Sequence, residues 1–310
     1  AKFGSLALPD MAAAYNCRWL PPGFRGWTVN PSSQEKLNSI RLVSPKGNWN
    51  GNMKASDAAP GAPVIIGPGR VGRSLAAAIG DGRVELRGRA EGLGDLAGRI
   101  VLLCVPDGAI ARVSEQIGAA GESPALIGHT SGATGLDALS GAGTEGSFSA
   151  HPLQTVPDGK TDLAGCPAAI AGSGPAALEV AARIAKSAGM KPFEVSEADR
   201  ATYHAAASIA SNFLVTLEQT AAELMGGIAV ENPREVLEPL VRRSLDNWLA
   251  RGPEALTGPI ARGDEATVEA HRRALSEQRP ELIPFYDALA DRTREIAGNE
   301  AVAEGGRPWR

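Results

Sequence analysis

Short apolar runs alternate with helix-forming segments along residues 61–196. Seven runs have the length of strands and are bounded by Gly, Pro or Asp: 63–67, 83–88, 99–106, 124–131, 146–153, 167–172 and 191–196. Good helix formers fill four segments between them, at 73–80, 108–120, 134–142 and 174–189. The run 99–106 is almost continuously apolar, as expected of a strand that helices cover on both faces. The alternation predicts an α/β fold with a doubly wound parallel sheet.

The pattern changes after residue 196, where the strand signals stop. Ser196 and Asp199 form a start that resembles a capping box, and a helical pattern then continues to Gly226 and Gly227. Further helical stretches follow at 233–250, 264–277 and 281–297. We therefore expect an all-helical domain over residues 197–303 and a short tail over 304–310.

Residues 1–60 show neither the helical nor the strand period for any length, although they hold most of the asparagines and tryptophans of the chain. We expect a poorly ordered N-terminal extension. Met53 would be a natural translation start ahead of the first strand. The alternative is an ordered arm that its tryptophans hold in place.

Composition and charge narrow the class of partner. The net charge is −4 and the basic residues do not cluster, so neither nucleic acid nor an anionic membrane is an expected partner. No apolar run is long enough for a membrane helix. Cys17, Cys104 and Cys166 are widely spaced and match no metal-binding pattern, so we expect no metal site and idle thiols in a reducing compartment. A cytoplasmic protein with a small-molecule partner fits these features.

A glycine-rich turn joins the first predicted strand to the first predicted helix. In a dinucleotide-binding site Gly67 would allow the tight turn, Gly69 the approach of a pyrophosphate, and Gly72 close packing of helix on strand. The amides at the helix start would complete the anion site. The predicted segment is Gly67, Pro68, Gly69, Arg70, Val71 and Gly72, in a domain of the Rossmann type over residues 61–196. The alternative is a glycine turn with a purely structural use.

Arginines lie at the end of the second predicted strand, about 20 residues after Gly67, where an NAD-binding protein usually has an acidic residue. Arg87 and Arg89 could hold the 2′-phosphate of NADP by charge-assisted hydrogen bonds. NADP is therefore the expected cofactor, and NAD remains possible. The alternatives are two solvated surface arginines, or Glu85 or Glu91 as the acidic group.

Small and polar residues also follow the third and fourth apolar runs, at the edge where open parallel sheets bind ligands. We expect further cofactor contacts from Val105, Pro106, Asp107, Thr130 and Ser131. Asp107 could instead, or also, cap the next helix. His129 and His151 are candidate substrate contacts, with a structural histidine at a strand end as the alternative for His151.

The long helix after residue 199 carries a polar stripe. His204, Ser208 and Asn212 follow at four-residue intervals on an otherwise apolar surface. If this stripe lines a cleft, His204 could exchange the proton of a carbonyl group being reduced, and Ser208 and Asn212 could orient the substrate. The alternative is a set of polar side chains that hydrogen-bond between packed helices.

Four motifs in the same order resemble those of the Rossmann-like proteins with the uncharacterised domain DUF2520: "GHTSGATGLDAL", "GSFSAHPLQ", "YHAAASIASNFLV" and "LTGPIARGD". The resemblance covers about residues 62–298. It places the chain in the superfamily of 6-phosphogluconate and 3-hydroxyacid dehydrogenases, with ketopantoate reductase and pyrroline-5-carboxylate reductase. It implies a helical domain that supplies catalytic groups and the contact of a homodimer.

Two site assignments depend on this resemblance. The dehydrogenases commonly have lysine on the first long helix, so His204 departs from their pattern but belongs to the motif of the DUF2520 proteins. In the last motif Thr257 and Arg262 are candidate substrate residues, with Arg262 free to hold a carboxylate. A surface ion pair of Arg262 with Asp264 or Glu265 is an alternative of equal weight to this substrate role.

The expected function is that of an NADP-dependent oxidoreductase. It would move hydride between the nicotinamide and a small oxo or hydroxy acid bound between the two domains. A reductase of C=N bonds, of the pyrroline-carboxylate type, is the first alternative. The second is a sensor or scaffold that binds NADP without turnover.

Overall fold

We describe the fold from a computed structural model, in which residues 62–80 and 82–298 are described. The expectations for residues 1–60 and 304–310, and for Cys17 and Met53, lie outside these residues. The chain divides between Arg200 and Ala201 into two compact units. Each unit is described by itself.

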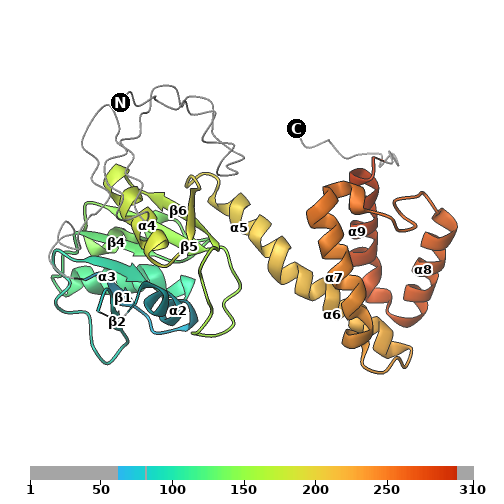
Figure 1. Cartoon of the computed structure of the whole chain (residues 1–310), viewed down its shortest axis with the longest axis horizontal. Coiled ribbons are helices and arrows are strands. Elements are labelled where there is room, and N and C mark those ends of the chain that lie inside the picture. The colour runs from blue at the N-terminus through green and yellow to red at the C-terminus, as the bar shows by residue number, and fades with distance from the viewer. Residues whose placement is uncertain (1–61, 81, 299–310) are drawn as a thin grey trace, which may run out of the picture. The chain divides into compact units, whose positions relative to one another are not determined.

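The first unit is built on a seven-stranded sheet in the order β2-β1-β3-β4-β5-β6-β7 (Figure 1). The strands are β1 (Val64–Ile66), β2 (Glu85–Arg87), β3 (Ile100–Leu103), β4 (Leu126–His129), β5 (Ser147–Pro152), β6 (Pro167–Gly172) and β7 (Lys191–Glu194). Each lies within a run that the sequence predicts as a strand. The α/β class and the mostly parallel sheet are confirmed.

One strand pair departs from the predicted parallel sheet, because β6 runs antiparallel to β5. The connection between them, residues 153–166, contains no helix. A parallel neighbour needs a crossover that carries the chain back to the starting edge of the sheet, usually through a helix. Without one, the chain re-enters the sheet from the edge at which β5 ends.

Helices cover both faces of this sheet. They are α2 (Arg70–Ile79), η2 (Asp107–Ala109), α3 (Ile110–Ala119), η3 (Leu136–Ala142) and α4 (Pro175–Ser187). Neighbouring residues of a strand point to opposite faces. Ile65 accordingly packs in one buried cluster with Leu75 of α2, and Val64 in the other with Ile110 of α3. The predicted helix at 134–142 is a 3₁₀ helix.

The second unit is helical throughout its described residues, as predicted. Its elements are α5 (Arg200–Ser208, beginning at the last residue of the first unit), η4 (Ile209–Phe213), α6 (Leu214–Gly227), α7 (Pro233–Arg251), η5 (Gly252–Ala255), α8 (Glu265–Gln278), η6 (Pro280–Leu282) and α9 (Ile283–Ile296). Ahead of α5, Ser196 Oγ accepts a hydrogen bond from the amide of Asp199 at 3.2 Å and donates to its carboxylate at 2.6 Å. These two bonds correspond to the capping-box-like start of the long helix that the sequence predicts.

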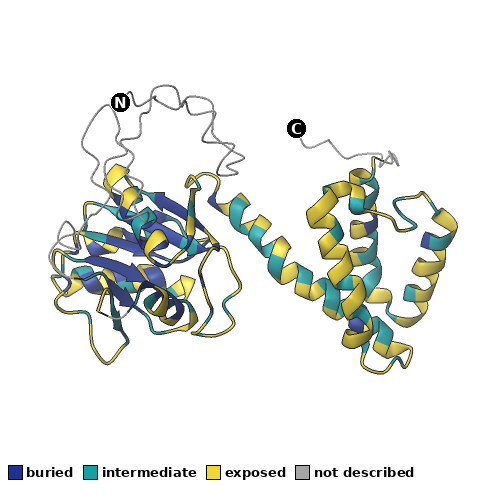
Figure 2. Cartoon of the chain, viewed as in Figure 1, coloured by how far each residue is buried: buried dark blue, intermediate teal, exposed yellow. Residues whose placement is uncertain are grey.

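The helical unit keeps much of its apolar surface exposed. Among its described apolar side chains only Ala222, Val268 and Ala290 are buried. Exposed and half-buried residues therefore dominate its helices, whereas the sheet of the first unit is mostly buried (Figure 2). The helices that the structure describes include none with the length and apolar character of a membrane span.

Candidate functional site

The carboxyl ends of β1, β3 and β4 lie at one edge of the sheet, since these strands are parallel neighbours. The chain forms β2 on one side of β1 and then β3 on the other, so the strand order reverses between β1 and β3. Open α/β sheets bind ligands at such a reversal. The segments 67–72 and 104–107, which follow β1 and β3, flank it here.

Gly67 and Gly72 are required by the fold itself. Gly67 has a φ of +112°, which side chains rarely permit, and a methyl group there would overlap the carbonyl oxygen of Cys104. A methyl group on Gly72 would overlap the carbonyl oxygen of Gly67 and lie 3.1 Å from Cβ of Cys104. The first glycine makes the turn and the third brings α2 close to the strands, as expected of such a motif.

Gly69 differs, because the protein leaves space beside it. The nearest atom to a methyl group at Gly69 would be the carbonyl oxygen of Cys104, at 4.0 Å. Gly69 is the N-cap of α2, and in the described part of the chain no side chain caps this helix start and no acidic residue lies in its first turn. The amides of Arg70, Val71 and Gly72 begin the helix. Such a helix start can hold an anion.

The side chain of Arg87 is buried and paired within the first unit. This residue is 6% exposed, Nε donates a 2.5 Å hydrogen bond to Oε1 of Glu85, and Nη1 donates a 2.6 Å bond to the carbonyl of Gly94. Glu85 also pairs with Arg99 at 2.8 Å, and hydrogen bonds from the two arginines lower the pKa of its carboxyl group. Arg87 is therefore not a solvated surface residue. Its side chain holds the segment after β2 in place.

Arg89 is in a different position. It is exposed in the segment after β2. This segment touches the glycine turn, since a methyl group on Gly88 would lie 3.2 Å from Cγ of Pro68. Glu91 accepts a hydrogen bond from the amide of Gly88 at 2.8 Å. The side chain of Arg89 is thus an exposed arginine next to the candidate anion site, as are Arg70 and Arg73 of α2.

The segment after β3 borders the other side of the reversal. The Cys104 thiol is buried, which raises its pKa to about 12, so it is an inert thiol as expected. Val105 is half-buried and Pro106 and Asp107 are exposed. Asp107 is the first residue of η2, and among the described residues no side chain caps η2 or α3. The interpretation of Asp107 as a helix cap is therefore wrong.

His129 is buried inside the first unit and does not line an open site. Nδ1 accepts a hydrogen bond from the amide of Ser131 at 3.2 Å, and Nε2 lies 3.4 Å from the carbonyl of Gly135. Burial, together with the nearby charge of Arg200, lowers the pKa of His129 to about 4. The imidazole is neutral near pH 7 and supports the turn after β4, which corrects its assignment as a substrate contact.

Ser131 is also buried within this turn. Its Oγ accepts hydrogen bonds from the amides of Ala133 at 3.2 Å and Thr134 at 2.9 Å. Thr130 is half-buried, and its amide donates to the carbonyl of Leu103 at 3.2 Å. This bond ties the end of β4 to the end of β3. Of the two predicted cofactor residues, Thr130 is the more accessible.

The remaining substrate candidates lie in different elements. His151 is half-buried in β5, opposite Ala169. Arg262 is exposed and donates a hydrogen bond to the carbonyl of Thr257, which closes the turn ahead of α8. Instead of pairing with Arg262, Asp264 caps α8 by accepting from the amide of Thr267 at 3.1 Å. The expected alternative, an ion pair from Arg262 to this carboxylate, is therefore not formed.

The predicted catalytic stripe lies on α5 and the π-turn that follows it. His204 and Ser208 are half-buried in α5, and Asn212 is exposed in η4. In a regular α-helix the eight residues from His204 to Asn212 would drift by about 80° around the axis. A π-turn takes more residues for each turn and reduces this drift. It brings Asn212 closer to the line of the other two, a feature that the spacing alone did not reveal.

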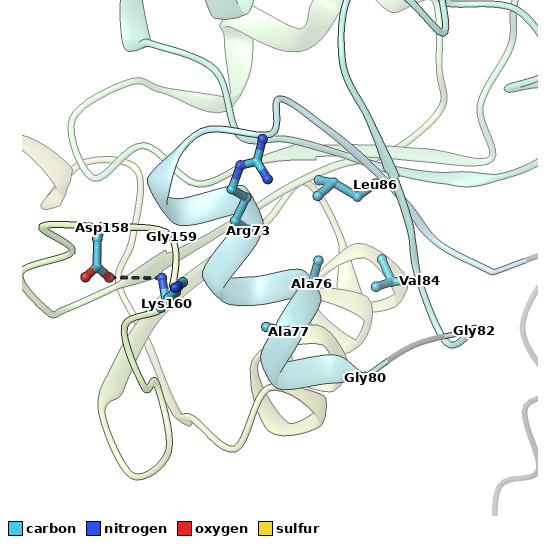
Figure 3. Close-up of a pocket in the computed structure, with 10 residues that line it drawn as sticks. All are labelled: Arg73, Ala76, Ala77, Gly80, Gly82, Val84, Leu86, Asp158, Gly159 and Lys160. Atoms are coloured by element: carbon cyan, nitrogen blue, oxygen red, sulfur yellow. Dashed lines mark hydrogen bonds between the residues drawn. The ribbon is translucent and has the colours of Figure 1, made fainter.

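A hollow of about 650 Å³ lies along α2 (Figure 3). Its lining residues are Arg73, Ala76, Ala77 and Gly80 of α2, Gly82, Val84 and Leu86 in and before β2, and Asp158, Gly159 and Lys160 from the connection after β5. None of the predicted site residues lines it. Because it runs down the side of α2 instead of across the strand ends, we place the candidate site at the glycine turn.

The family comparison agrees with the motifs. The model of the domain of unknown function DUF2520 matches residues 166–293. The matched region begins at the last two strands of the sheet and includes α5 to α8 and most of α9. Two of the four motifs, at 203–215 and 256–264, lie in the matched region, and the other two precede it. No curated protein has a matching sequence.

Solved structures share the fold of the chain. A protein of Bacteroides fragilis provisionally named an NADP oxidoreductase is 22% identical, with a TM-score of 0.61 over 76% of this chain and 98% of its own. A Thermotoga maritima protein is 21% identical, with a TM-score of 0.63 over 78% and 100%. A reductive aminase from Aspergillus terreus, in complex with NADPH and ethyl-5-oxohexanoate, is 16% identical, with a TM-score of 0.53 over 79% and 97%. These similarities show the Rossmann fold with its helical partner domain.

Proposed function

We propose that the protein is an NADP-dependent oxidoreductase acting on a small oxo or hydroxy acid. The glycine turn carries this proposal. Gly67 and Gly72 have no room for side chains, yet Gly69 between them faces open space at the start of an uncapped helix. The fold does not require a glycine at that position, whereas a pyrophosphate resting on the helix amides would. The NADP and NADPH in the names of two solved relatives agree with this ligand.

Each side of the glycine turn has a role in the proposed binding. Arg89 would hold the 2′-phosphate of the ribose in place of the buried Arg87, and a guanidinium group favours a phosphate over a plain hydroxyl. Val105, Pro106, Asp107 and Thr130 would border the rest of the cofactor. When bound, the nicotinamide donates or accepts the hydride.

Residues of the helical unit would supply the remaining chemistry. His204 would give a proton to the carbonyl oxygen during reduction and take it back during oxidation, since an imidazole suits proton transfer near neutral pH. Ser208 and Asn212 would orient the substrate. Arg262, with Thr257 behind it, and His151 are the residues proposed to hold the carboxylate.

The domain roles belong to the same proposal. Residues 61–196 would bind the cofactor, and residues 197–303 would bind the substrate and form a homodimer through their exposed apolar side chains. Among these are Phe213, Leu240, Trp248 and Leu249, the last 74% exposed. Large exposed apolar side chains on a folded unit are candidates for contact with a partner. The cytoplasmic location expected from the composition completes the proposal.

Titration of the purified protein with NADPH and NADH, followed by NADPH oxidation with a panel of oxo acids, tests this function. We expect NADPH to bind more tightly than NADH, and His204→Ala to lose turnover with unchanged NADPH affinity. His271→Ala is the matched control, because His271 is an exposed helical histidine that bonds to Tyr286 at 2.9 Å, outside the proposed site.

The panel also separates the competing functions. Turnover of cyclic imines or of oxo acids with amines, without reduction of the oxo acids themselves, would indicate a C=N reductase. Binding of NADPH without any turnover would indicate a sensor or scaffold. The absence of NADPH binding would overturn the proposal.

A further inference from the structure

Arg200, the first residue of α5, is buried in the first unit with 6% of its surface exposed. Its Nη2 donates a hydrogen bond to Oγ of Ser149 in β5 at 2.8 Å, and its Nη1 lies 3.4 Å from the carbonyl oxygen of Ser131. Arginine is almost never buried without such partners. The guanidinium group therefore joins α5 to β5 and to the turn after β4.

Glu197 completes this connection. Its Oε1 accepts hydrogen bonds from Nε of Arg200 at 3.0 Å and from Nη2. Its Oε2 accepts a bond from the amide of Leu136 at 2.8 Å. Arg200 thus contacts the first residue of the segment Ser131–Leu136 and Glu197 the last. We call this ion pair and its two contacts the 131–136 clamp.

The clamped segment is short and ordered by its own bonds. Ser131 Oγ bonds to the amides of Ala133 and Thr134 and lies 2.9 Å from Oγ1 of Thr134. Its position after β4 is at the edge that also carries the glycine turn. Thr130, one residue before the segment, is among the proposed cofactor contacts.

The clamp also fixes the first turn of the helix that carries the proposed proton donor. His204 follows Arg200 by four residues and therefore lies one turn further on the same face of α5. Two parts of the proposed site, the turn after β4 and the start of α5, are held by one ion pair. A displacement of either would disturb the other.

We propose that Arg200 is a positioning residue of the oxidoreductase, which with Glu197 holds the turn after β4 and the first turn of α5 in the arrangement that binds NADPH. The inference rests on the proposed function. Neither residue contacts the reacting atoms in this scheme. Loss of Arg200 would leave Oε1 of Glu197 and the hydroxyl of Ser149 without the guanidinium donor, and Glu197 would no longer be fixed beside Leu136, so the segment 131–136 would open.

The test compares Arg200→Gln, Arg200→Lys and Ser149→Ala with the wild type. Hydrogen exchange of the amides at 133–136 is measured without cofactor, and NADPH affinity by calorimetry. We expect Arg200→Gln to raise both the exchange rates and the NADPH dissociation constant at least tenfold. Arg200→Lys should recover part of the affinity, and Ser149→Ala should shift both readings less. Arg242→Gln is the control, since it breaks the surface pair with Glu238 on α7.

The readings separate the two proposals. If the wild type fails to bind NADPH, the proposed function fails, and the exchange rates alone decide whether the clamp exists. If Arg200→Gln leaves both readings within twofold of the wild type, the positioning role is overturned. It is also overturned if exchange rises equally over residues 64–80, because the effect is then a general loss of the fold. Should Arg200→Gln not fold, Glu197→Gln and Ser149→Ala give the same comparison.

Discussion

The carbonyl oxygen of Gly67 occupies the space that a side chain on Gly72 would need. The turn after β1 and the first turn of α2 are therefore packed backbone against backbone. No such contact surrounds Gly69, which lies between them. The three glycines thus have separable roles, two in folding and one in the proposed binding.

This separation predicts opposite effects of two similar substitutions. Gly72→Ala should destabilise the protein by about 3 kcal/mol or prevent folding, because the methyl group has nowhere to go. Gly69→Ala should cost only about 1 kcal/mol, since Gly69 has an extended backbone and alanine is merely a poorer helix cap. The same Gly69→Ala change should raise the NADPH dissociation constant at least tenfold. Urea unfolding and calorimetry check these values, and unchanged affinity in Gly69→Ala would contradict the binding role.

Arg87, the last residue of β2, and Arg89, which follows it, predict a second contrast. Arg89→Ala should weaken NADPH binding about tenfold or more and leave NADH binding and stability unchanged, because its exposed side chain would meet only the 2′-phosphate. Arg87→Ala should instead destabilise the protein by about 3 kcal/mol, since it leaves the carbonyl of Gly94 without its donor and Glu85 with Arg99 as its remaining partner. Measurement of both dissociation constants and of the unfolding free energy distinguishes them. Equal losses of NADPH and NADH affinity in Arg89→Ala would refute the specificity argument.

The assignment of Arg87 shows where sequence spacing stops being informative. The position at which NAD-binding proteins usually have an acidic residue pointed to Arg87 and Arg89, but it did not tell which arginine faces solvent. Arg87 belongs to the strand, and Glu85 lies two residues before it, so both side chains lie on the same face. That pairing was readable in the sequence. Arg99, the second partner of Glu85, was not, because it comes from a distant part of the chain.

Local patterns predicted the strands and helices because apolar periodicity reports burial directly. The antiparallel β6 had a readable signal as well, since the preceding connection, residues 153–166, is rich in Pro, Gly and Asp and lacks a helical pattern. The burial of Arg200, by contrast, had no readable signal in the sequence. Its partners Ser149 and Ser131 are far away in sequence, and only the folded sheet brings them to the start of α5.

His129 predicts a pH dependence of stability. Its pKa is about 4 in the folded protein and near 6.5 in an unfolded chain, so between these values the unfolded chain binds more protons. The free energy of unfolding should therefore fall as the pH decreases from about 6.5 to 4, with His129 contributing at most about 3 kcal/mol. His129→Asn should lack this contribution. Urea unfolding of both proteins at several pH values measures the difference, which should shrink on acidification; a difference independent of pH would contradict the assignment.

The exposed apolar side chains of α7 predict the oligomeric state. The helical unit buries few of its apolar side chains. Contact with the same surface of a second copy of the chain would bury more of them. The wild type should be a dimer by analytical ultracentrifugation, and Leu249→Asp or Leu240→Asp should weaken dimerisation at least a hundredfold with unchanged helix content. Asn232→Asp adds the same charge at the N-cap of α7 without touching an apolar side chain, so it should remain dimeric. A monomeric wild type, or dimers in all three variants, would show that another partner or surface covers this face.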